Sequence, residues 1–333
     1  MEKVPSSKEP KSQQLNWIGN GGILICGALV FLFAAQSKLN AQGLNVGAID
    51  QANAEAVRLK REGEYTQGAE LAQKTLERAE KELGSDHPST IKSLENLAAL
   101  YARLHRNWDA RPLFERAWQT RQRVVEKERP ETMSKLEPLR QTGTQLVRMG
   151  QLKTAEQAYK QALEISEREL GREHPQTLAI LLELGFVNAR PEKMEEGASL
   201  LKRAFEGSKR VLGEEHPHTD RSLALRNLIL ADQGRYEDAE QLIDSEFGPD
   251  HPATPQQLHD LAQYGMGKDR YEDAQRIFKH ALEVGKRQLA QGYDAVCVPF
   301  RKSLDRLVAF YRNEGHVQDV EQLLTRFTEC QVR

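Results

Sequence analysis

The stretch Gly213-Glu-Glu-His216-Pro217-His-Thr219 is one of several copies of the phrase Gly-x-x-His-Pro-x-Thr in this chain of 333 residues. The other copies are Gly84–Thr90, Gly171–Thr177, Gly248–Thr254 and a reduced form over Arg129–Thr132. Their prolines are 42, 45, 42 and 35 residues apart. Recurrence at such a period indicates a repeat architecture. The phrase has the chemistry of a turn between helices, because glycine can close one helix in the left-handed conformation and proline fits the first turn of the next.

A second phrase, Gly-x-Tyr-x-x-Ala, lies between these turns and is clearest at Gly234–Ala239. Apolar residues on either side follow the spacing of a helix face, as Leu94, Leu97 and Tyr101 do in the second unit. Small residues such as Ala98 and Ala110 let two helices approach closely. We therefore expect about seven pairs of helices, around residues 52–84, 91–126, 136–171, 178–213, 220–248, 255–290 and 299–330.

This pattern resembles the tetratricopeptide repeat, and the long period with its His-Pro turn resembles the kinesin-light-chain-like subclass. The resemblance covers residues 51–330. It implies an all-α, right-handed superhelical solenoid that binds other proteins in the groove lined by the first helix of each unit. It also implies a non-catalytic protein. The likeness stops at the repeats, since no heptad coiled coil precedes them.

The first fifty residues are of a different kind. Residues 1–16 are polar with a basic character, and residues 17–37 contain no charged side chain. Residues 38–50 are expected to be a linker. The apolar centre, Ile23–Ala35, suits either a transmembrane anchor or a signal peptide cleaved after Ser37. In both cases the repeats are predicted to lie outside the cytoplasm, on a single-pass membrane protein or on an exported one.

Composition and motifs argue against several classes of function. The 47 basic and 49 acidic side chains nearly cancel, so nucleic acid is not an expected partner. The sequence carries no zinc-protease, nucleophile-elbow, dinucleotide or phosphate-loop motif. The recurring histidines belong to successive turns, too far apart to share a metal ion. We therefore expect no enzyme, no cofactor and no metal.

Arginine recurs two residues before the inner turn of each of the first four units. These residues are Arg61, Arg103, Arg148 and Arg190. One interpretation is a groove that binds an acidic segment or a C-terminal carboxylate. The other is that the arginines lie at helix ends, where the dipole favours cations, and bind nothing. Asn53 and Asn96 are further candidates for contact with a partner.

Two cysteines, Cys297 and Cys330, flank the last pair of helices. Outside the cytoplasm they could form a disulfide, and otherwise they are free thiols. The sequence favours a scaffold that recruits protein partners at a membrane. The alternative is a permanent subunit of a cell-envelope complex that uses edges rather than the groove, and an enzyme with an unrecognised site is a remote one.

Overall fold

The computed structural model describes residues 45–291 and 297–313, and those of the described residues that follow Ala48 belong to one compact unit. The segment 17–37 and Cys330 lie outside the described residues, so the anchor or signal peptide and the Cys297–Cys330 bond remain predictions. Within the described ranges the chain forms helices and turns and no strand. No helix in these ranges combines the length and apolar character that crossing a membrane requires.

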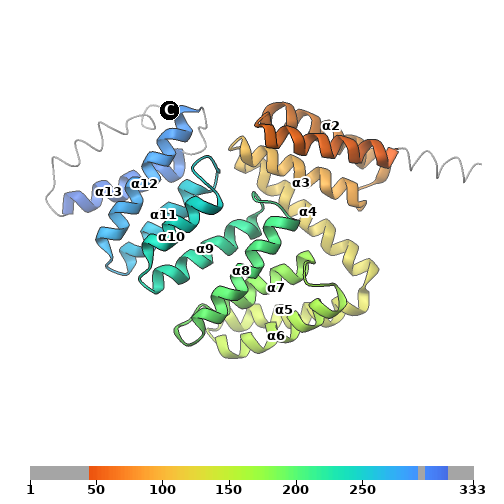
Figure 1. Ribbon diagram of the computed structural model, residues 1–333. Helices are drawn as coiled ribbons and strands as arrows, with labels where there is room; N and C mark the ends of the chain where they lie inside the picture. Colours follow the sequence, from red (N-terminus) through yellow and green to blue (C-terminus); the bar gives the residue numbers. More distant parts are fainter. Residues whose placement is uncertain (1–44, 292–296, 314–333) are drawn as a thin grey trace, which may run out of the picture. The chain divides into compact units, whose positions relative to one another are not determined.

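The helices follow one another in pairs (Figure 1). They are a helix over residues 45–62, α2 (Tyr65–Leu83), α3 (Pro88–Arg103), α4 (Asn107–Glu128), α5 (Pro130–Arg148), α6 (Leu152–Glu169), α7 (Pro175–Asn188), α8 (Met194–Val211), α9 (Pro217–Asp232), α10 (Tyr236–Glu246), α11 (Thr254–Gly267), α12 (Tyr271–Ala290) and α13 (Cys297–Asn313). A short 3-10 helix, η1 (Pro191–Lys193), precedes α8.

Each predicted unit is one such pair, with the first helix running up to the inner turn and the second leading to the His-Pro turn. Six complete pairs and α13, the first helix of the seventh, are described, which confirms the all-α repeat fold. One boundary differs from expectation. Residues 45–50, expected as linker, are already helical, and Ile49 is buried at 1% exposure. Burial of this side chain favours an earlier start of the first helix.

The His-Pro turn has the same hydrogen bonds in each full copy. In the fifth unit, Thr219 Oγ1 donates to the carbonyl oxygen of Gly213 at 2.7 Å, and His216 Nδ1 accepts the backbone N–H of His218 at 3.1 Å. His216 is thus the N-cap of α9, and Gly213 has φ 103°, a conformation that glycine adopts without strain. The expected turn chemistry is confirmed, and the histidine of the phrase is the N-cap of α3, α7 and α9.

Where the two helices of a unit cross, the first helix carries a small residue seven positions before its inner turn. Gly185 shows why, because a Cβ atom there would lie 2.7 Å from Leu201 Cγ of the partner helix. In the first six units this position is Ala56, Ala98, Gly143, Gly185, Asn227 and Ala262. Asn227 is the exception, and its partner helix α10 is short, ending at Glu246. The fifth unit therefore departs from the others at its centre.

Candidate binding site between helices α9 and α11

The four predicted arginines do not share one environment. Arg61 and Arg148 are exposed and form no ion pair with the described residues. Arg103 donates to Glu215 Oε1 at 2.6 Å and to Glu214 Oε2 at 3.1 Å. Arg190, with 12% of its side chain exposed, pairs with Glu156. Two of the four cations are therefore already neutralised within the chain. Arg103 and Arg148 are the last residues of α3 and α5, as the helix-end interpretation expects.

Asn53 and Asn96 are brought together, but as part of the protein interior. Asn53 has no exposed surface, and its Nδ2 donates to the carbonyl oxygen of Ser89 at 3.1 Å. Its Oδ1 accepts from Ser93 Oγ at 2.9 Å and from Asn96 Nδ2 at 3.2 Å. These three hydrogen bonds join the first helix to α3. With no exposed surface, Asn53 contacts residues of its own chain, and contact of Asn53 or Asn96 with a partner stays a prediction.

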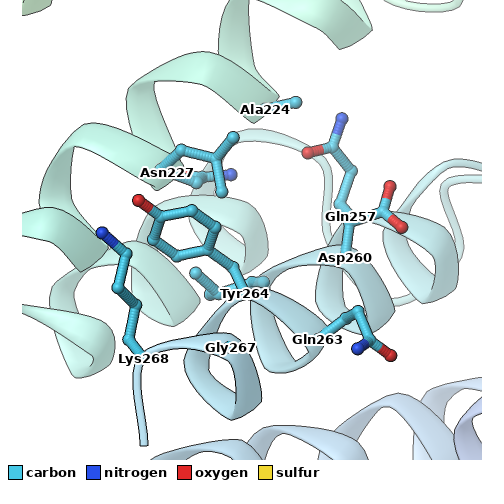
Figure 2. Close-up of a pocket in the computed structure, with 10 residues that line it drawn as sticks. Ala224, Asn227, Gln257, Asp260, Gln263, Tyr264, Gly267 and Lys268 are labelled. Atoms are coloured by element: carbon cyan, nitrogen blue, oxygen red, sulfur yellow. The ribbon is translucent and has the colours of Figure 1, made fainter. Parts of the chain in front are cut away.

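A cavity of about 500 Å³ opens between α9 and α11, the first helices of the fifth and sixth units. Figure 2 shows Ala224 and Asn227 of α9 opposite Gln257 and Tyr264 of α11, with Lys268 at one end. Leu228 and Leu261 add apolar surface. Ala224 stands ten residues before its inner turn, the place that Asn53 takes in the first unit. The methyl group of Ala224 therefore leaves open the space that the side-chain amide of Asn53 fills in the first unit.

Asn227 is 2% exposed, and neither its Nδ2 nor its Oδ1 has a hydrogen-bond partner among the described residues. A buried polar group left unpaired costs about 1–3 kcal/mol, so an unpaired amide in a native protein calls for an explanation. Asn188 is also buried and unpaired, but it lines none of the described cavities. Asn227 lines the cavity, where a bound molecule could supply both a donor and an acceptor.

Comparison with known proteins gives the family of this chain. The tetratricopeptide-repeat family model matches residues 54–123 and 138–193, and a second model of the same description matches residues 177–218. The chain is a tetratricopeptide-repeat protein. Its period and its His-Pro turns are of the kinesin-light-chain-like type. No curated protein matches the chain.

Several solved structures are similar to this tetratricopeptide-repeat protein. A crystal structure of nearly identical TPR-like repeats of a putative kinesin light chain from Podosopora anserina is 23% identical, covering 60% of this chain and 93% of that one, with a TM-score of 0.32. BtubC (BKLC) from P. vanneervenii is 16% identical over 85% of this chain and 91% of its own, with a TM-score of 0.36. At these identities and TM-scores the family models, and not these neighbours, identify the chain.

One end of the cavity carries a matched pair of charges. Tyr264 donates its hydroxyl to Asp232, and Lys268 Nζ lies 2.9 Å from Asp232 Oδ1. Burial raises the pKa of Tyr264, and the hydrogen bond to Asp232 raises it further. Asp232 occupies the position that holds arginine in the first four tetratricopeptide units. This end of the array therefore offers an apolar, amide-floored cavity and no excess of positive charge.

The residues around the cavity include one side-chain amide that is fixed by a hydrogen bond to the neighbouring helix. Gln257 Nε2 donates to the carbonyl oxygen of Asp220 at 2.8 Å, which fixes its side chain against α9. The ionisable side chains that line the cavity are Asp260, Tyr264 and Lys268. In the described part of the chain no three histidine, cysteine or acidic side chains gather as metal ligands would. Sequence reasoning missed Asn227, although an asparagine in a series of alanines and glycines was a visible signal.

Proposed function

We propose that this tetratricopeptide-repeat protein is a non-catalytic scaffold and binds a peptide segment of a protein partner between α9 and α11. The observation that supports this proposal is Asn227, a buried amide with both polar atoms unpaired at a cavity of about 500 Å³. A peptide bond presents one N–H donor and one C=O acceptor, the complement of a side-chain amide. An extended segment with a medium-sized apolar side chain satisfies both the amide and the apolar walls at Leu228 and Leu261.

Affinity-purification of partners from native membranes tests the site, using the intact chain, Asn227→Ala and Asn188→Ala. Asn188 is the matched control, because it is as buried and as unpaired as Asn227 but lines none of the described cavities. We expect Asn227→Ala to lose a partner that Asn188→Ala retains, with both variants as helical as the wild type by circular dichroism. Partner sets that are identical for all three proteins would contradict the proposed site and favour a permanent subunit that uses edges of the array.

We further propose that segment 17–37 holds this scaffold at a membrane or directs its export. Support comes from the uncharged stretch centred on Ile23–Ala35, which follows basic residues. N-terminal sequencing of the mature protein distinguishes the two forms, since a cleaved chain begins after Ser37. Protease protection in sealed vesicles then reports the side of the repeats. An uncleaved chain that sodium carbonate washes from membranes would contradict both forms of this proposal.

A further inference from the structure

The His-Pro turn of the fifth unit contacts residues far away in the sequence. Glu215, whose side chain is 1% exposed, lies between Lys60 of the first unit and Arg103 of the second. Its Oε2 is 2.9 Å from Lys60 Nζ and its Oε1 is 2.6 Å from Arg103 Nε. The neighbouring Glu214 places its Oε2 3.1 Å from Arg103 Nη2. Two adjacent carboxylates of one turn are therefore held by two cations of another part of the array.

Aromatic contacts accompany these ion pairs. The ring of His216 meets Phe114 edge-on at 5.2 Å between centroids, and His218 lies against Trp118 at 4.6 Å. Beside them is a cavity of about 600 Å³, with Trp108 at its edge, 92% exposed. Aromatic rings and an arginine, residue types that are enriched where proteins recognise a partner, therefore occur together in this contact.

Stacking of the repeats does not require this contact. In a solenoid each unit is stabilised by its immediate neighbours, whereas this turn joins the fifth unit to the first and second.

The two cations strongly favour the charged form of Glu215. Burial alone raises the pKa of Glu215, but Lys60 and Arg103 more than offset this, and the pKa falls to about 2. Without the turn, Lys60 and Arg103 have no other carboxylate partner among the described residues.

We propose that Lys60 and Arg103 form a binding surface for paired carboxylates, which the chain's own Glu214-Glu215 turn occupies until an acidic segment of a protein partner displaces it. This inference rests on the proposed scaffold function and names a second partner class for it. The surface fits an acidic pair because the chain itself supplies one there. Displacement separates the fifth unit from the first two and exposes Phe114 and Trp118, so that binding and opening of the array are one event.

The internal turn is a strong competitor. A segment tethered in the same chain acts at an effective concentration in the millimolar range, so a free acidic peptide competes poorly with it in the wild type. Neutralising the turn should therefore raise the affinity for the peptide. Charge pairs of this kind weaken with ionic strength, although less so where they are buried.

The first test uses Glu214→Gln combined with Glu215→Gln and a fluorescein-labelled synthetic peptide of residues 211–219. We expect fluorescence anisotropy to show about tenfold or more tighter binding to this double variant than to the wild type. A peptide with glutamine in place of both glutamates should not bind, and adding Arg103→Glu to the double variant should abolish binding. Arg148→Glu is the matched control, because Arg148 ends the equivalent helix of the next unit and is exposed. Equal binding to wild type and double variant, or none to either, would overturn the proposal.

The second test measures opening without any partner. Small-angle X-ray scattering should give a larger radius of gyration for Glu215→Arg, with the helical signal in circular dichroism retained. Combining Glu215→Arg with Arg103→Glu exchanges the charges and should restore the compact form. An unchanged radius for Glu215→Arg would show that the turn does not hold the array closed. Neither test involves Asn227. The displacement proposal can therefore fail while the partner-binding role of the α9–α11 cavity stands, and that role can fail while the displacement proposal stands.

Discussion

Two pairs of neighbouring first helices in this protein each contain a buried asparagine, and the two asparagines are in opposite states. In the first pair, the helix over 45–62 and α3, Asn53 is joined to two serines and an asparagine of α3. In the second pair, α9 and α11, Asn227 is as buried but has no partner, and a cavity lies beside it. The first arrangement joins units. The second leaves hydrogen-bonding capacity for a molecule from outside.

The difference follows from a few substitutions at equivalent positions. The place of Asn53 is taken by Ala224 in the fifth unit, and the place of Ser93 by Gln257 in the sixth. Gln257 turns its amide to the backbone of Asp220 and leaves Asn227 unpaired. One repeat architecture can therefore make either a sealed or an open helix pair with a change of two or three side chains.

The largest expected difference between the two helix pairs is in how far a lower pH reduces their stability. Burial lowers the pKa of His216 and His251 to about 3 and that of His218 and His259 to about 4. Each is neutral when folded and gains a proton on unfolding, so it reduces stability as the pH falls below about 6.5. Asp220, whose pKa burial raises to about 8, acts with the opposite sign and favours the folded state as the pH falls from 8. Summed over these five groups, the change from pH 7 to 5 is a loss of stability on the order of 5 kcal/mol.

Hydrogen exchange at pH 7 and pH 5, corrected for intrinsic rates, checks this expectation. Protection should decrease in α9–α11, where His216 caps α9 and His259 belongs to α11, before it decreases in residues 45–103. The Asn53 network contains only amide and hydroxyl groups, which do not titrate in this range. Equal loss of protection in both regions would mean that the array unfolds as a single block.

Placing an asparagine at another helix crossing should show that only the fifth unit has room for it. For Gly185→Asn the new Cβ would lie 2.7 Å from Leu201 Cγ and 3.3 Å from its backbone nitrogen. Overpacking and an unpaired buried amide together should lower the unfolding free energy on the order of 4 kcal/mol. Urea denaturation measures this loss, with Gly185→Ala as the smaller reference. A loss below that of Gly185→Ala would refute the idea that this crossing is closed to an amide.

Removing the satisfied asparagine tests the sealed pair. Asn53→Ala deletes three hydrogen bonds, two of them buried, and leaves a void, so we expect the unfolding free energy to fall by about 2–3 kcal/mol. Asn96→Ala should cost less, since Asn96 is only half-buried. Urea denaturation followed by circular dichroism provides both values. Equal costs for the two variants would indicate that burial does not set the strength of this network.

The smallest effect, and one of opposite sign, is expected at the open pair. Asn227→Ala places at this crossing the residue that Ala98 and Ala262 provide in other units. Deleting an unpaired buried amide should leave stability unchanged or raise it by about 1 kcal/mol, while partner binding is lost. The same denaturation experiment applies. A loss as large as that of Asn53→Ala would show that the amide is satisfied inside the protein after all.

Much of this fold could be predicted from the sequence because the turn phrase carries its own hydrogen bonds. The repeat, the helix pairs and the short second helix of the fifth unit follow from local spacing and from Gly248 and Pro249. The binding residues could not be predicted in the same way. Whether Arg103 is free depends on Glu215, which lies 112 residues away, and no local pattern carries that information.

The turn itself has a consequence for how such a chain could arise. One hydrogen bond joins His216 to the second residue after it and another joins Thr219 to the sixth residue before it, so both bonds lie within residues 213–219, at the start of α9. A module with such internal closure can be copied, inserted or deleted as a cassette. Gene duplication could then lengthen the array one pair at a time, with spacings as different as 35 and 45 residues tolerated between copies.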